Sequence, residues 1–127
     1  MKDLEAIQRF RAICNALPEA TEQSEGSVGK PVFKVRDKIF AMQHPMADRP
    51  SMWCKSTLDF RDMLVNSEPQ RYFVPPYVGR HGWIGVWLDG ELDWDLIGHL
   101  IETSYRRTAP KRLSVLIGQA NAHKNSP

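Results

Sequence analysis

The chain has 127 residues, of which 42% are hydrophobic and 25% are charged, and these proportions are typical of one folded globular domain. They exclude a fibrous or disordered chain, and no apolar run approaches the roughly 20 residues of a transmembrane helix. The formal net charge is only +2. Such a small charge weakens long-range attraction to nucleic acid, so phosphate binding would have to use local basic patches.

Charge is distributed unevenly along the chain. Residues 26–88 contain nine basic and five acidic side chains. Residues 89–102 contain five acidic side chains and no basic one, whereas residues 103–127 contain five basic side chains and no acidic one. The basic side chains that bear on function are therefore expected in the middle and at the end of the chain.

The cysteines and the N-terminus indicate the compartment. Cys14 and Cys54 lie in apolar settings without paired spacing, which favours buried free thiols and a reducing environment. The opening residues MKDLEAIQRF place acidic side chains where a signal peptide needs its apolar segment. We therefore expect a cytoplasmic protein without membrane association, in which residues 1–121 form a single domain and residues 122–127 a flexible C-terminal tail.

The first half of the chain predicts one helix followed by three strands. An apolar stripe with helical spacing predicts a helix from Asp3 to Leu17, which Pro18 ends. The polar residues 19–30 are expected to form a solvated connection. Alternating side chains then predict strands at 32–36, 39–42 and 51–55, the first two joined as a hairpin by a turn at Asp37-Lys38.

The second half predicts three helices and two strands. Ser56 or Thr57 can cap a helix that reaches Asn66, and a short strand follows at 71–74. The sequence WIGVWL predicts a strand at 83–88, before a helix at about 93–107 and another that begins near Pro110. The order α-β-β-β-α-β-β-α-α favours an α+β fold, a two-layer sandwich with an antiparallel sheet and helices on one face.

Several segments, in order, resemble the MmcQ/YjbR family. They are Phe73-Val74-Pro75-Pro76-Tyr77-Val78-Gly79, Gly82-Trp83-Ile84-Gly85-Val86, Trp94, Ser104-Tyr105, Ala109 to Leu113, and upstream Pro31 to Val35 and Lys38 to Ala41. The resemblance covers nearly the whole chain. It implies the two-layer architecture of secretion chaperones and a DNA-binding-like arrangement of paired hairpin wings, and it implies no established activity.

Two basic groups are candidates for binding nucleic acid. Lys34 and Arg36 share one face of the first hairpin, close to Lys38, and a hairpin with such cations can lie against a phosphate backbone. Edge strands also carry lysines merely to keep a polar face in water. The second group is Arg106, Arg107, Lys111 and Arg112. Its cations flank a break between two helices, where they would either hold an anion or stabilise a helix C-terminus.

The aromatic residues suggest a different site. Trp83 and Trp87 should share a strand face with Gly85 between them, opposite the apolar face formed by Ile84 and Val86. They would form either a ligand platform or a surface packed beneath the proline-containing loop. Glycine at the middle position indicates close approach of another group. A small-molecule or peptide groove here would include Tyr77, Arg80, His81, Trp83 and Trp87.

Nothing in the sequence nominates an enzyme. The histidines show no metal-ligand spacing with one another or with the cysteines, and the acidic run at residues 89–95 lacks the pattern of an EF-hand. We therefore expect no catalytic residues, metal or cofactor. The leading hypothesis is a small DNA-binding protein. The alternatives are a small-ligand or peptide module and a chaperone-like dimer that binds a protein partner.

Overall fold

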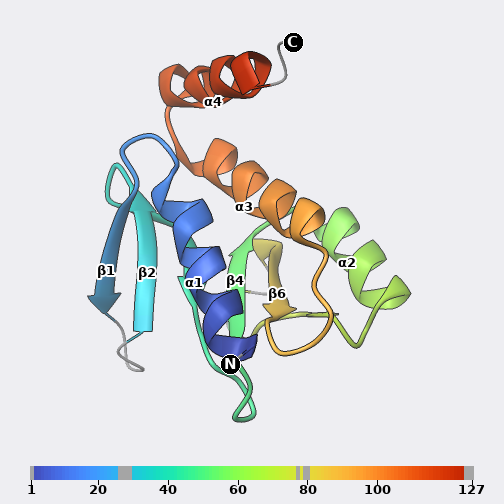
Figure 1. The fold of residues 1–127 in the computed structure, drawn as a ribbon. Helices are drawn as coiled ribbons and strands as arrows, with labels where there is room; N and C mark the ends of the chain where they lie inside the picture. The colour runs from blue at the N-terminus through green and yellow to red at the C-terminus, as the bar shows by residue number, and fades with distance from the viewer. Residues whose placement is uncertain (1, 26–29, 77, 79–80, 125–127) are drawn as a thin grey trace.

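The computed structural model describes residues 2–25, 30–76, 78 and 81–124, and it forms an antiparallel sheet with helices packed against one face (Figure 1). The helices are α1 (Lys2–Asn15), α2 (Leu58–Ser67), α3 (Trp94–Thr108) and α4 (Lys111–Lys124). The strands are β1 (Thr21–Glu25), β2 (Lys30–Val35), β3 (Lys38–Gln43), β4 (Ser51–Lys55), β5 (Tyr72–Phe73) and β6 (Trp83–Trp87). The strand order is β1-β2-β3-β4-β6-β5. The predicted α+β two-layer architecture is confirmed.

Alternation along the strands gives the sheet two different faces. Met52 and Cys54 of β4 lie beside Val86 and Ile84 of β6, and all four are buried in the core. Their partners are the apolar stripes of α1 and α3, which lie in front of the sheet in Figure 1. Leu64 of α2 joins the same core. The opposite face of β4 and β6 carries the tryptophans.

The prediction of a connection at residues 19–30 is wrong in part, because Thr21–Glu25 form the edge strand β1. Its sequence TEQSE contains no apolar residue, so the alternation that indicates a strand packed on a core is absent. Backbone pairing with β2 holds it in place. Arg11 of α1 adds a bidentate ion pair with Glu22, at 2.6 Å for the shorter contact.

Three boundaries also differ from the sequence-based expectation. Arg36 and Asp37, with φ of 52° and 65°, form the turn between β2 and β3, one residue earlier than predicted. Two consecutive residues with positive φ are the pattern of a type I′ hairpin turn. Helix α1 ends at Asn15, and α4 continues to Lys124, into the segment assigned to the tail. Residues 125–127 lie outside the described part.

Candidate functional site

Two of the seven basic residues predicted to bind nucleic acid, Arg36 and Arg106, form ion pairs with carboxylates of the protein itself. Arg36 donates from Nε and Nη2 to the two carboxylate oxygens of Glu19 at 2.9 and 3.2 Å. Arg106 donates to Glu102 at 3.1 Å and to the carbonyl oxygen of Ser114 at 3.2 Å. These two guanidinium groups are already partly neutralised by the protein itself.

The remaining predicted cations lie in different settings. Lys34 is half-buried on β2, on the side of the strand away from the core residue Phe33. Lys111 and Arg112 are exposed in the first turn of α4, where Arg112 lies close enough to Glu19 to lower the pKa of that carboxyl group. None of these three joins the main cluster described next.

Lys38 and Arg107 converge on Lys55, a cation that the sequence analysis did not assign. The Lys55 ammonium donates to Thr108 Oγ1 at 2.9 Å and lies 6.0 Å from the centre of the Trp83 ring. Burial lowers the pKa of Lys55, and the positive charges of Lys38 and Arg107 lower it further. We call Lys38, Lys55 and Arg107 the basic cluster. Within the described residues, none of its members forms an ion pair.

Three different elements supply the basic cluster. Lys38 begins β3, Lys55 ends β4, and Arg107 lies in the last turn of α3. The backbone N–H of Lys55 donates to Ser104 Oγ at 2.8 Å, and the same hydroxyl donates to the carbonyl oxygen of Phe40 at 2.5 Å. This buried serine therefore ties together the backbones of β3, β4 and α3, the three elements that carry the cations.

A cavity of about 390 Å³ adjoins the basic cluster at the N-terminus of α2. It is lined by Ser56, Thr57, Leu58, Asp59, His81, Gly82 and Arg107. Gly82 has φ +87°, and its carbonyl oxygen accepts from the Ser56 N–H at 2.9 Å. A Cβ at Gly82 would lie 2.7 Å from the Ser56 carbonyl oxygen, so glycine allows the loop bearing His81 to approach α2. His81 and Arg107, assigned to separate sites from the sequence, thus line one cavity.

The tryptophan face is filled by the protein's own side chains. Trp83 is only 8% exposed. The centres of the Phe73 and Trp87 rings are 4.3 Å apart, and Cζ of the Arg49 guanidinium lies 4.0 Å from the centre of the Trp87 ring. A Cβ at Gly85 would lie 2.2 Å from Phe73 Cζ, so the predicted close approach at this glycine is made by Phe73.

The residues predicted for an aromatic groove are therefore dispersed where they can be described. Trp83 lies beneath Lys55, and Trp87 lines a separate cavity of about 280 Å³ together with Gln70, Arg71, Gly90 and Glu91. Tyr77 and Arg80 lie outside the described residues. His81 lies with Arg107, as described above.

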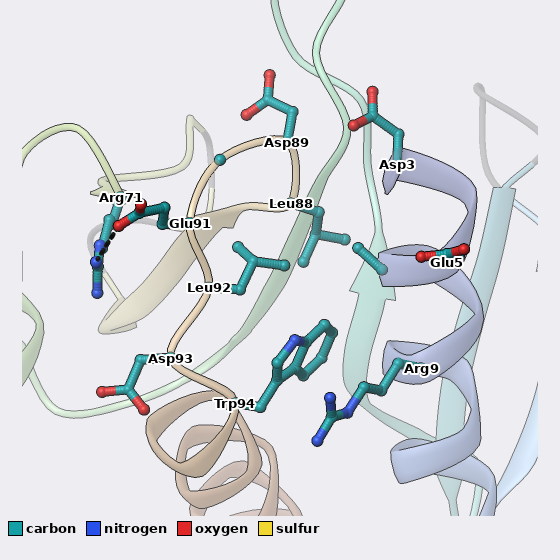
Figure 2. A pocket seen from close by; sticks show the side chains of 12 residues that line it. Asp3, Glu5, Arg9, Arg71, Leu88, Asp89, Glu91, Leu92, Asp93 and Trp94 are labelled. Carbon is teal, nitrogen blue, oxygen red and sulfur yellow. Dashed lines mark ion pairs between the residues drawn. The ribbon is translucent and has the colours of Figure 1, made fainter. Parts of the chain in front are cut away.

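The opposite end of the sheet is acidic. β4 and β6 are antiparallel, with Lys55 beside Trp83 and Ser51 beside Trp87, so the segment after β6 lies far from the basic cluster. There, α1 and residues 88–94 border a cavity of about 640 Å³ (Figure 2). Its carboxylates are Asp3, Glu5, Asp89, Glu91 and Asp93.

Several side chains around this acidic cavity have partners within the protein. Arg71 forms an ion pair with Glu91 at 3.7 Å, and the Arg9 guanidinium lies 4.7 Å from the centre of the Trp94 ring. Figure 2 draws these four side chains and marks the Arg71–Glu91 pair with a dashed line. Asp93 caps α3 by accepting from the Leu96 N–H at 3.2 Å. Among the described residues, no group of His, Cys, Asp and Glu side chains is arranged to hold a metal ion.

The two cysteines are buried free thiols, as predicted. Burial raises the pKa of the Cys54 thiol to about 12 and that of Cys14 well above its usual value. Neither provides a thiolate nucleophile at neutral pH. None of the described helices combines the length and apolar character needed to cross a bilayer.

The sequence analysis missed Lys55, although its position gave a signal. Lys55 is the last residue of a correctly predicted strand and directly precedes the residues that cap α2. A side chain next to a helix N-terminus lies close to backbone N–H groups that favour an anion. Its two cationic neighbours come from β3 and α3, and sequence spacing does not bring them together.

Comparisons with known proteins agree with the fold. The chain is 28% identical over 103 residues to the Escherichia coli (strain K12) protein named "Uncharacterized protein YjbR". The aligned region covers 80% of this chain and 85% of that protein. The same figures hold for its counterpart in Escherichia coli O157:H7. The crystal structure of the Deinococcus radiodurans protein DR2400, a DUF419 domain, superposes with a TM-score of 0.69 at 24% identity and covers 78% of this chain and 75% of that one.

The family model supplies the decisive match. The model described as YjbR matches residues 15–107, which include all six strands, α2 and most of α3. These are the elements that build the sheet and the basic cluster. The resemblance stated from the sequence is therefore confirmed, and the chain belongs to the YjbR family.

Proposed function

We propose that this domain binds nucleic acid, with DNA as the expected ligand, through phosphate contacts made by the basic cluster. The observation that carries the proposal is the position of Lys55, whose ammonium donates to Thr108 Oγ1 at 2.9 Å, beside Arg107. The charges of Lys38 and Arg107 act on it, and no member of the basic cluster has a carboxylate partner among the described residues. Contacts of this kind supply most of the affinity of sequence-independent DNA binding.

The electrostatics of the cluster favour an anionic ligand. Burial is the main cause of the lowered pKa of Lys55, and the positive charges of Lys38 and Arg107 lower it further, so both effects disfavour the charged ammonium in the unliganded protein. A phosphate group placed between the cations would offset the repulsion between them. Lys111 and Arg112, exposed in the first turn of α4, offer further positive charge at the same end of the molecule.

The acidic cavity indicates which end of the molecule a nucleic acid would contact. Its carboxylates repel phosphate, so a nucleic acid is expected to contact the end that carries the basic cluster and to avoid residues 88–94. The small net charge provides little additional attraction. We therefore expect weak, salt-sensitive binding that depends on backbone phosphates rather than on base sequence.

A direct test measures binding of a short, fluorescently labelled, mixed-sequence duplex at low salt by anisotropy. The proposal predicts saturable binding that weakens as salt is added, and a charge-reversal variant, Lys38→Glu, should weaken it further. Absence of binding at low salt, or binding that neither salt nor Lys38→Glu changes, would contradict it.

A small-ligand function remains the second candidate, and the cavity beside Trp87 is the observation that favours it. The Phe73 ring and the Arg49 guanidinium already pack against Trp87, so a ligand there would contact little of its indole face. Ligands that bind only the native state raise the unfolding temperature. A metabolite that produced such a shift and quenched tryptophan fluorescence, in a protein that bound no DNA, would favour this candidate.

A further inference from the structure

The cavity at the N-terminus of α2 has hydrogen-bond donors on several sides. Arg107 contributes a guanidinium group from α3, and His81 contributes an imidazole from the loop before β6. Arginine presents its N–H groups as a fork that matches two oxygens of a phosphate. Arg107 has no carboxylate partner in the described part of the chain, so a ligand would not have to displace one.

The first turn of α2 adds backbone donors to these side chains. Thr57 caps the helix, and its hydroxyl oxygen accepts from the Phe60 N–H at 3.1 Å. The N–H groups of Leu58 and Asp59 have no protein acceptor among the described residues. Free N–H groups at a helix N-terminus favour an anion, and here they border the same cavity as the two side chains.

We propose that this cavity binds a phosphomonoester, namely the terminal phosphate of a nucleic-acid strand, between Arg107, His81 and the first turn of α2. The proposal rests on the function proposed above and names the part of the nucleic acid that this cavity takes. Donors from three elements suit the three terminal oxygens of a phosphomonoester, whereas an internal phosphodiester offers two.

One residue in the cavity opposes an anion. Asp59 lines it and carries a negative charge in the first turn of α2, where carboxylates also stabilise the helix N-terminus. Asp59→Asn removes that charge and nearly preserves the side chain's shape. Affinity for a strand with a terminal phosphate should therefore rise in this variant if the phosphate occupies the cavity.

The test compares two single-stranded oligonucleotides of the same sequence, labelled at the 3′ end, one with a 5′-phosphate and one with a 5′-hydroxyl. Hydrogen bonds to charged groups predict that the 5′-phosphate tightens binding to the unmodified protein by about 10-fold or more. The preference should disappear in Arg107→Gln and increase in Asp59→Asn. The matched control is Arg106→Gln, because Arg106 is the neighbouring arginine and pairs with Glu102, and this variant should keep the preference.

The outcomes separate this inference from the proposed function. Equal affinity for the two oligonucleotides, or a preference that Arg107→Gln leaves intact, overturns the inference while DNA binding stands. The third arm titrates inorganic phosphate and follows the backbone amide resonances of Leu58 and Asp59. If these resonances shift while neither oligonucleotide binds, the cavity takes a phosphate group from a small molecule, and the nucleic-acid proposal fails. If phosphate leaves them unchanged and the 5′-phosphate gives no preference, the cavity is not a phosphate site.

Discussion

Replacing Lys38 and Arg107 by glutamine should reduce the salt dependence of DNA binding, whereas replacing Arg36 and Arg106 should not. Both double variants remove the same formal charge and leave α3 and the β2–β3 hairpin with one substitution each. They differ in what the lost cations contact. Lys38 and Arg107 belong to the basic cluster, while Arg36 and Arg106 already pair with Glu19 and Glu102.

The size of the effect follows from the number of unpaired cations. Each phosphate neutralised contributes about −0.9 to the slope of log K against log salt. Three contacts from the basic cluster therefore predict a slope of about −2.7, which is a loss of about 40-fold in affinity between about 50 and 200 mM salt. The Lys38→Gln, Arg107→Gln variant keeps only Lys55, so its slope should be about −0.9 and its loss about 3.5-fold.

Anisotropy titrations of a labelled duplex at several salt concentrations give these slopes directly. The Arg36→Gln, Arg106→Gln control should keep a slope within about 0.5 of that of the unmodified protein, since its ion-paired side chains release few counterions. Equal reductions in the two double variants would refute the reasoning. Affinity would then follow total charge, and the location of the cluster would be irrelevant.

The remaining predictions concern stability and are measured by urea unfolding. Gly85→Ala should lower the unfolding free energy by about 1–3 kcal/mol, because a Cβ would lie 2.2 Å from Phe73 Cζ; an equal cost in a Phe73→Ala background would contradict this cause. Ser104→Ala should cost about 1–3 kcal/mol, since its buried hydroxyl joins backbone groups of β3 and β4; a neutral result would show that another group replaces it. Asp89→Asn should cost up to about 1 kcal/mol at neutral pH, because the Arg49 guanidinium lowers the pKa of Asp89 in the folded state. A lowered pKa stabilises the folded state only while the carboxyl is ionised, so this cost should vanish as the pH falls through and below the carboxyl's usual value of 3.8; a cost that persists there would point to packing instead.

The sheet was predictable where strands contribute side chains to the core. Residues 51–55 alternate between core and opposite face, and the predicted strand has the observed bounds. β1 was missed for the converse reason. Its residues bury no apolar side chain in the core, and the pairing that holds it to β2 uses backbone groups that every sequence has.

The candidate site was predictable only in its separate parts. The sequence identified Lys38, His81 and Arg107 as functional candidates. It did not bring them together, because their proximity depends on the packing of α3 against β3 and β4 and on the approach of Gly82 to Ser56. The sequence also did not show which cations form ion pairs. Arg36 and Arg107 look alike in the sequence, and only the fold shows that one of them faces a glutamate.

The most direct test of the basic cluster is a titration of isotope-labelled protein with a short DNA duplex, followed by backbone amide NMR. We predict that the largest shift changes map to Lys38, to Lys55 and the first turn of α2, and to the end of α3 near Arg107. Residues 88–94, around the acidic cavity, should remain unchanged. Shift changes concentrated at residues 88–94 or around Trp87, with the basic cluster unaffected, would contradict the central claim.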